Sequence, residues 1–200
     1  MKAVQRPLGW IAERHTMKTA LILHGKPSYE EYCNPQIPSP SNNHWLPWLQ
    51  KQLLLNGFLA QTPELPAPYA PVYQEWRLAF EQFRIDEHTA LIGHSCGAGF
   101  LLRWLSENKV TVGKVALVAP FLDPSRSKVA KDFFLFPWEH HLIARTSGIN
   151  VFFSTDDGPD ILNSVASIKA SIDGIEFTEF TDRGHFILTE TFPELLHWLL

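Results

Sequence analysis

A serine between two glycines lies where a predicted strand meets a predicted helix. The motif is GHSCG at residues 93–97, preceded by the β-rich run HTALI at 88–92 and followed by the helical pattern GAGFLLRWLSENK. A serine on so tight a turn adopts strained backbone angles, and the turn closes only if the residues two positions away are nearly free of side chain. Glycine at positions 93 and 97 meets that requirement. The motif therefore favours a fold in which a buried strand ends directly at the N-terminus of a helix.

Strands and helices are predicted to alternate along most of the chain. The apolar runs indicate strands at 19–25, 58–66, 88–94, 114–120, 150–157 and 175–180, the last alternating as an edge strand does. Periodic apolar positions indicate helices at 44–57, 72–84, 97–109, 160–173 and 191–200. We expect Asp160 to be the N-cap of the fourth helix, and Thr191 with Glu194 to form a capping box at the last. This order predicts βαβ units and a three-layer α/β fold with a mostly parallel sheet.

The length and net charge of the chain argue against several classes of protein, among them multidomain proteins and proteins that bind nucleic acid. With 200 residues and 22.8 kDa, the chain suits one domain. We expect that domain at 17–200, after an N-terminal extension at 1–16, because the first core-like segment begins only after Met17. The net charge of −4 offers no basic surface for nucleic acid or an anionic membrane. The N-terminus lacks a signal-peptide pattern and no apolar run is long enough to span a bilayer, so we expect a cytoplasmic protein.

The chain also supplies partners for a nucleophilic serine, in a chemically meaningful order. A serine hydroxyl near neutral pH needs a base, and the base needs an acid to orient it. Asp156 and Asp157 follow the strand at 150–157, and His185 lies in the loop before the last helix. In an open parallel sheet, catalytic groups gather outside the carboxyl ends of the strands. Spacing alone therefore predicts Ser95 as nucleophile and His185 as base, with either aspartate as the acid.

Backbone amides near Ser95 are candidates for stabilising an oxyanion. The Cys96 amide lies at the start of the helix, where the helix dipole favours negative charge. A second donor is expected from the loop after the first strand, at Gly25 or Lys26. We expect His24, which precedes Gly25, and His94, which precedes Ser95, to be structural hydrogen-bonding residues rather than proton carriers.

Four segments together resemble a known family. The stretches GHSCGA, STDD and TDRGHF, with HWLPWL upstream, are similar to the small α/β-hydrolase family that includes the retinoblastoma-binding serine hydrolase and its bacterial relatives. The resemblance covers nearly the whole chain after Met17. It implies an α/β-hydrolase sandwich with little or no cap and a triad of Ser95, Asp157 and His185. No L-x-C-x-E peptide occurs, so it implies no retinoblastoma-type partner.

These observations predict a serine hydrolase that cleaves small carboxylic esters or related acyl bonds through an acyl-enzyme. We expect a small-molecule acyl substrate and neither a metal nor an organic cofactor; protein partners stay unassigned. A transferase or thioesterase would use the same residues. The alternative is a retired hydrolase scaffold that binds a ligand or protein, suggested by the unusual acid run DDGPD at 156–160 and the crowded Lys26-Pro27 loop. The aromatic stretch 133–138 is either core or one wall of an acyl pocket.

Overall fold

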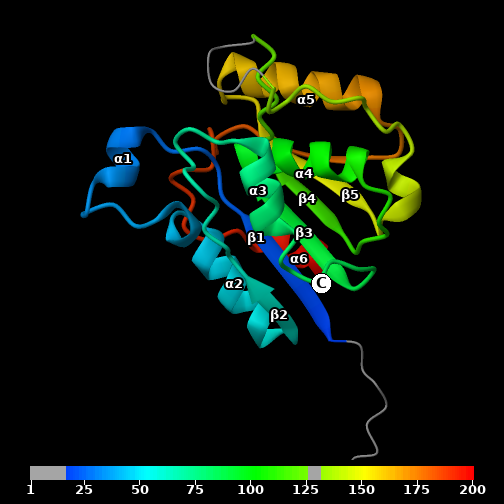
Figure 1. Cartoon of the computed structure of the whole chain (residues 1–200), viewed down its shortest axis with the longest axis horizontal. Coiled ribbons are helices and arrows are strands. Elements are labelled where there is room, and N and C mark those ends of the chain that lie inside the picture. The colour runs from blue at the N-terminus through cyan, green and yellow to red at the C-terminus, as the bar shows by residue number, and fades with distance from the viewer. Residues whose placement is uncertain (1–16, 126–131) are drawn as a thin grey trace, which may run out of the picture.

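Six parallel strands form one sheet. The computed structural model describes residues 17–125 and 132–200, and the expected extension at 1–16 lies outside the described residues. The spatial order is β2-β1-β3-β4-β5-β6, with every neighbouring pair parallel (Figure 1). The strands are β1 (Lys18–Leu23), β2 (Phe58–Gln61), β3 (Thr89–His94), β4 (Val115–Val118), β5 (Ile149–Ser154) and β6 (Glu176–Phe180). The segment predicted to be an edge strand is β6, at one edge of the sheet, and β2 forms the other edge.

Helices cover both faces of the sheet. They are α1 (Tyr29–Cys33), α2 (Leu46–Leu55), α3 (Tyr73–Phe80), α4 (Cys96–Glu107), α5 (Pro159–Ser171) and α6 (Pro193–Leu199), with 3-10 turns η1 (Pro40–Asn42) and η2 (Leu142–Arg145). Figure 1 shows α3 and α4 in front of the strands and α6 behind them, where α6 contacts α2. The predicted three-layer α/β sandwich is confirmed. None of the helices within residues 17–125 and 132–200 is long and apolar enough to cross a membrane.

The core fills the space between the sheet and these two layers. Every residue of β3 and β4 is buried, as expected for strands covered on both faces. In front, Phe80 of α3 packs edge-to-face against Phe100 and Trp104 of α4. Behind, Trp45 packs edge-to-face on Phe192. Each such buried side chain contributes about 1.5–3 kcal/mol through the apolar surface it removes from water.

Two predicted helix starts are wrong by one or two residues. The N-cap of α5 is Gly158 rather than Asp160, and α6 begins after Phe192 without the expected capping box. In both cases a proline, Pro159 or Pro193, occupies the first helical position. Proline is preorganised for that position and lacks the amide hydrogen that would go unsatisfied there. The prolines therefore set the starts, and the expected side-chain caps are not used.

The segment between β1 and α2 contains a short helix, α1, for which no helix was predicted. Ser28 Oγ accepts from the Glu31 amide, and Glu31 Oε2 accepts from the Ser28 amide at 2.7 Å. This is a capping box, which satisfies two amides that the first turn of a helix leaves without partners. It fixes α1 above the carboxyl ends of the strands.

Candidate active site

Ser95 lies at the junction of β3 and α4 with backbone angles that few residues adopt. Its φ is 53° and its ψ is −117°, a conformation that costs on the order of 1–3 kcal/mol for a residue other than glycine. The Ser95 amide donates to the Val118 carbonyl at 2.9 Å, and the Phe121 amide donates to the Ser95 carbonyl at 3.1 Å. The same carbonyl accepts from the Ala98 and Gly99 amides. Backbone hydrogen bonds to β4 and the residues after it, and to the first turn of α4, therefore hold the strained turn in place.

The two flanking glycines are required by close backbone contacts. A Cβ atom at Gly93 would lie 2.6 Å from the backbone of Ala98, and one at Gly97 would lie 2.5 Å from the His24 carbonyl oxygen. Neither neighbour is a flexible side-chain end that could move aside. The helix can therefore start this close to β1 and β3 only with glycine at both positions, as the motif predicts.

Three side chains from distant parts of the sequence meet at this turn. Ser95 Oγ lies 2.9 Å from His185 Nε2, and His185 Nδ1 lies 2.9 Å from Asp157 Oδ2. A carboxylate can only accept, so Nδ1 carries the hydrogen and Nε2 of the neutral ring is free to accept the serine hydroxyl proton. The residues follow the carboxyl ends of β3, β5 and β6. The structure thus brings together the serine, histidine and second aspartate singled out in the sequence.

The two adjacent aspartates have different partners. The Asp157 carboxylate faces His185, and its other oxygen accepts from the Gly158 amide at 2.6 Å. Asp156 points to the backbone instead: its Oδ1 accepts from the Ser154 hydroxyl and from the Gly184 amide at 2.9 Å. These hydrogen bonds, that from Ser154 first, lower the pKa of Asp156. The alternative that the sequence left open is therefore separated by geometry: Asp157 contacts the imidazole, and Asp156 holds the loop that carries it.

The loop around His185 is anchored from below as well. The buried His94 ring lies 2.9 Å through Nε2 from the His185 carbonyl oxygen, so Nε2–H donates. Burial, and next the nearby His185, lower the pKa of His94 well below its ordinary value and keep the ring neutral. Phe186 adopts a left-handed φ of 59° and is fully buried, stacked on Phe192. These contacts fix the orientation of His185 before any ligand arrives.

A comparison with protein families agrees with this arrangement. The family model described as serine hydrolase matches residues 37–197. The chain belongs to the serine hydrolase family. The match includes the turn at Ser95, the two aspartates and the loop of His185.

Individual relatives in the serine hydrolase family extend over most of the chain. The rat (Rattus norvegicus) serine hydrolase RBBP9 is 31% identical over 157 residues, covering 76% of this chain and 82% of RBBP9. YdeN of Bacillus subtilis (strain 168) is 28% identical over 160 residues, covering 78% of this chain and 84% of YdeN. The crystal structure of the ydeN gene product superposes with a TM-score of 0.74 at 25% identity, over 91% of this chain and 96% of that one.

Backbone amides of this serine hydrolase lie next to Ser95 where the sequence placed an oxyanion site. Cys96 is the first residue of α4, and first-turn amides have no acceptor within their own helix. On the other side, a Cβ atom built on Gly25 would lie 3.0 Å from Ser95 Cβ, so the loop of Gly25 and Lys26 passes directly over the serine. Burial raises the pKa of the Cys96 thiol far above its ordinary value. The Cys96 side chain is therefore a neutral thiol rather than a thiolate.

His24 fixes that loop. Its Nδ1 lies 2.7 Å from the Gly25 carbonyl oxygen, and its Nε2 lies 2.9 Å from the Leu65 amide nitrogen. Nδ1 therefore donates and Nε2 accepts, which requires the neutral ring. Burial lowers its pKa accordingly. The prediction that both neighbouring histidines are structural hydrogen-bonding residues is confirmed.

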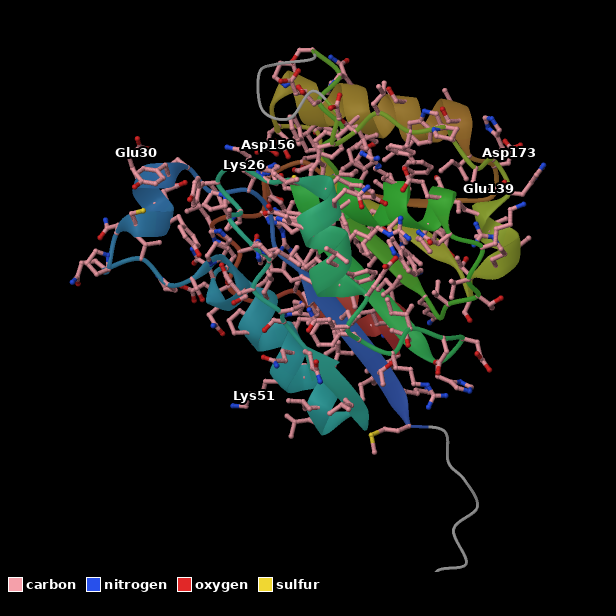
Figure 2. The ribbon with its side chains drawn as sticks, viewed as in Figure 1. Lys26, Glu30, Lys51, Glu139, Asp156 and Asp173 are labelled. Atoms are coloured by element: carbon pink, nitrogen blue, oxygen red, sulfur yellow. The ribbon has the colours of Figure 1, made fainter. Side chains whose placement is uncertain are left out.

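Two hollows open on either side of Ser95 and His185. The first hollow, about 220 Å³, lies under the segment 26–44 and reaches Leu46 and Ile187. The second hollow, about 340 Å³ and more open, is lined by Phe121 and the start of α5. Lys26 borders both. Figure 2 shows Lys26 and Asp156 at the same end of the molecule, and Lys51 near the opposite end.

The aromatic stretch 133–138 contributes to the core, not to these hollows. Phe133 is buried against Trp76 and Tyr73. Among the described residues, those lining the two hollows include Phe121 but none from 133–138. Phe134 reaches the site only indirectly, through an edge-to-face contact with Phe121. Of the two interpretations that the sequence left open, the core interpretation therefore holds for Phe133, and the described residues of this stretch line neither hollow.

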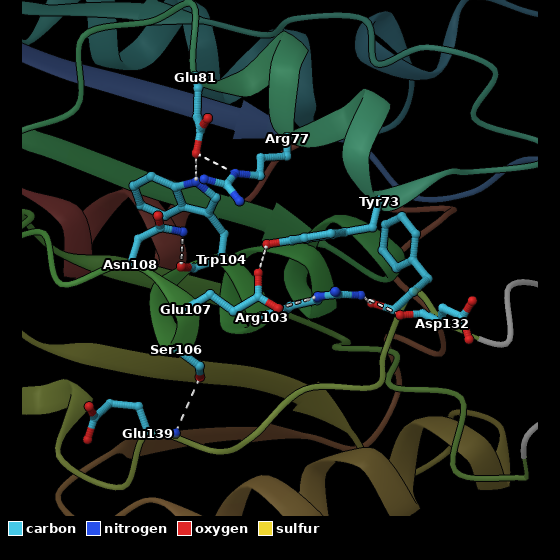
Figure 3. A network of polar contacts seen from close by, with 11 residues as sticks. Tyr73, Arg77, Glu81, Arg103, Trp104, Ser106, Glu107, Asn108, Asp132 and Glu139 are labelled. Carbon is cyan, nitrogen blue, oxygen red and sulfur yellow. Dashed lines mark hydrogen bonds and ion pairs between the residues drawn. The ribbon is translucent and has the colours of Figure 1, made fainter.

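An arginine on α4 holds this stretch in place (Figure 3). The Arg103 guanidinium donates to the backbone carbonyls of Asp132 and Phe133 and to the Glu107 carboxylate, and it stacks 3.5 Å from the centre of the Tyr73 ring. The Tyr73 hydroxyl donates to Glu107 at 2.6 Å. The network therefore ties α3, α4 and the chain at 132–133 together.

Proposed function

We propose that this member of the serine hydrolase family cleaves small carboxylic esters through an acyl-enzyme. The observation that carries the proposal is the continuous pair of 2.9 Å hydrogen bonds from Ser95 through His185 to Asp157. Such an arrangement can move a proton off a serine hydroxyl, because the imidazole already has the tautomer that accepts it. No step of this proposed chemistry requires a metal or an organic cofactor.

The reaction follows from the positions of the atoms. Ser95 Oγ attacks the acyl carbon while His185 Nε2 takes its proton, and the carbonyl oxygen becomes an oxyanion. We assign the stabilisation of that oxygen to the amides of Cys96 and of Gly25 or Lys26, because these residues lie next to Ser95. His185 then protonates the leaving alcohol, which departs from the acyl-enzyme. A water molecule, deprotonated by the same imidazole, then attacks the acyl carbon, and His185 gives that proton to Ser95 Oγ as the bond to the acyl group breaks and the acid is released.

The carboxylate supports each of these steps without taking the proton itself. Asp157 holds Nδ1–H of His185 and stabilises the imidazolium that forms twice in each cycle. Its side chain is only 6% exposed, so water competes little for the hydrogen bond. The Gly158 amide donates to the other oxygen of the same carboxylate and so helps to hold its orientation.

The unusual acid run also supports an active enzyme over a binding module. Gly158 and Pro159 begin α5 immediately after the aspartates. The amide at Gly158 bonds the carboxylate of Asp157 rather than displacing it. The residues that suggested a retired scaffold therefore contribute a contact to the acid of the proposed triad.

Fluorophosphonate labelling tests the proposal. The folded protein is expected to form one adduct, on the peptide that contains Ser95, and Ser95→Ala is expected to form none. Wild type should hydrolyse p-nitrophenyl acetate, and the Ser95→Ala and His185→Ala variants should lose that activity while keeping the wild-type circular dichroism spectrum. A folded wild-type protein that neither labels nor turns over the ester would rule the proposal out and return the binding module as the better reading.

A further inference from the structure

We propose that the first hollow binds a linear apolar chain attached to the scissile ester. The inference rests on the proposed function and adds the class of substrate. The hollow is continuous with Ser95 and His185, so whatever occupies it lies next to the reacting carbonyl. The walls of the first hollow therefore decide which ligand fits, and they combine apolar side chains with polar groups that mostly have hydrogen-bond partners already.

The polar groups around the first hollow are mostly satisfied within the protein. His24 has a partner at each ring nitrogen, and Nε2 of His94 is taken by the His185 carbonyl. Glu31 Oε2 accepts from the Ser28 amide in the capping box. A ligand gains little by hydrogen-bonding to groups that already have partners, because each new bond replaces an existing one.

Asn43 and His44, on the same wall, are also engaged. Asn43 Oδ1 accepts from the His44 amide at 2.9 Å. The His44 ring has a hydrogen bond with the backbone of Ile187, while burial lowers the pKa of His44. His44 is therefore neutral at physiological pH, and it adds no charge to the wall of the first hollow. Lys26 borders the hollow with an ammonium group on a four-carbon stem, which can lie along an apolar chain while its charge stays in water.

The remaining walls are apolar and lead out to the surface. The residues that form these walls come from the chain between β1 and α2, from the start of α2 and from the loop after His185. They are Tyr32, Ile37, Pro38, Pro40, Leu46 and Ile187. Ile37 is 38% exposed and Ile187 50%, and the next residue, Leu188, is 92% exposed. Exposed apolar side chains that surround the opening of a pocket are a mark of a binding site for an apolar ligand. Here they extend the first hollow beyond its enclosed part.

The second hollow suits the other half of the ester. It is wider and more open, and the carboxylate of Asp160 and the start of α5 form part of its wall. Because the second hollow is the more open of the two, an apolar chain placed there would be less shielded from water than in the first. The first hollow is therefore the better place for the chain, and the second for the shorter group across the ester bond.

The chain can belong to the acyl group or to the alcohol, since both flank the same carbonyl. Two ester series separate these sources. The first is p-nitrophenyl acetate to decanoate, with a constant leaving group; the second is the acetates of ethanol to decanol, with a constant acyl group. Both are kept below the concentration at which the long esters form micelles. In one series kcat/KM should rise by about fourfold per methylene that enters the hollow.

Two serine substitutions, one in the 26–44 segment and one in the loop after His185, test whether the dependence of kcat/KM on chain length arises in the first hollow. In Ile37→Ser and Ile187→Ser, the ratio of kcat/KM for the eight-carbon ester to that for the two-carbon ester should fall at least fivefold relative to wild type. Leu78→Ser is the matched control, because Leu78 is 68% exposed on α3 and does not line the hollow. Its ratio should equal that of wild type. Using two positions keeps the test informative if one variant does not fold.

The outcomes distinguish the inference from the proposed function. Ser95-dependent hydrolysis without a rise in either series overturns the inference and leaves the hydrolase intact. A rise that Leu78→Ser flattens as much as Ile37→Ser does also overturns it. Absence of Ser95-dependent hydrolysis on every ester removes the proposed function and the inference with it. A rise in one series that both wall variants flatten supports the first hollow as the chain site and identifies which half carries the chain.

Discussion

The ring of His94 donates to the backbone carbonyl of His185 at 2.9 Å, so the residue before Ser95 positions the residue that faces it. The contact spans 91 positions of sequence. It links the end of β3 to the loop after β6, and it lies beneath the imidazole rather than beside it. Two neighbouring histidines therefore have separate tasks: His94 is a neutral structural donor, and His185 presents its free nitrogen to the serine.

Removing the donor at position 94 should loosen His185. His94→Leu leaves a buried carbonyl without its partner, which costs about 1–3 kcal/mol of unfolding free energy. A shift of the imidazole should also lower kcat on the order of tenfold to a hundredfold. His94→Gln is the control, because its amide can still donate at nearly the same place, and it should recover most of kcat. Urea denaturation and ester turnover measure the two effects, and equal kcat in both variants would contradict the positioning role.

The two aspartates should respond very differently to amide substitution. Asp157→Asn presents a donor to Nδ1 of His185, which favours the wrong tautomer, and kcat should fall on the order of 10⁴-fold. Asp156→Asn keeps an oxygen that can accept from Ser154 and Gly184, so kcat should fall less than about tenfold. Steady-state kinetics on p-nitrophenyl acetate decide the matter. If Asp156→Asn were the more damaging change, the assignment of the acid would be reversed.

Glycine-to-alanine changes should separate folding from chemistry. At Gly97 the added Cβ would lie 2.5 Å from a backbone oxygen, so the variant should lose about 1–3 kcal/mol of stability. At Gly25 the nearest atom is 3.0 Å away, and a small shift of the loop suffices. That shift moves an oxyanion donor, so kcat should fall by up to about 10²–10³-fold with little change in melting temperature. Unchanged kcat in a folded Gly25→Ala protein would remove this loop from the proposed oxyanion site.

Stability should decrease as the pH falls from 7 to 5. Burial lowers the pKa of His24 and His94 in the folded protein, whereas in the unfolded chain a histidine titrates near 6.5. Below that pH the unfolded chain binds protons that the folded chain does not. The unfolding free energy should therefore fall by up to about 1.4 kcal/mol per pH unit for each histidine. Urea denaturation at several pH values measures the slope, which His94→Gln should reduce; a flat profile in wild type would disagree with neutral buried rings.

Arg103 should matter for stability rather than for turnover of short esters. Arg103→Lys keeps the positive charge but loses the planar fork that reaches Glu107 and the carbonyls of Asp132 and Phe133 together. We expect a loss of about 1–3 kcal/mol in unfolding free energy, with kcat on p-nitrophenyl acetate within twofold of wild type. Thermal denaturation and kinetics on the same preparation test this. A large loss of kcat at unchanged stability would mean that the network reaches the site through Phe134 and Phe121.

The sequence predicted the elements whose cause is local. Buried strands have continuous apolar runs, and the two glycines of GHSCG indicate a tight turn from a strand into a helix. The sheet, α4 and the position of Ser95 could therefore be inferred. The order of serine, aspartate and histidine then indicated which side chains meet. Helix starts at Pro159 and Pro193 were predicted less well, because the side-chain caps were weighed above the proline.

Features made by long-range contacts were not predictable in the same way. Periodicity says nothing about which face of the 26–44 segment lines a hollow, although Ser28 and Glu31 in capping-box spacing could have predicted α1. The hydrogen bond from His94 to His185 joins the end of β3 to the loop after β6, and their approach depends on the whole sheet. Similarly, Asp156 and Asp157 are neighbours in sequence, and only their contacts in the folded chain separate them: Asp156 accepts from Ser154 and the Gly184 amide, whereas Asp157 faces His185.

One wall of the first hollow is built mainly from a single stretch of chain, 26–44, which connects β1 to α2. This stretch carries the short helix α1, whose first turn is capped by Ser28 and Glu31. Because the stretch leaves the sheet at one point and rejoins the fold at another, it can be exchanged as a unit. A chimaera that carries this stretch from a relative would inherit a new preference for substrates on an unaltered reaction centre. Diversification within such proteins can thus proceed by replacing one connection at a time.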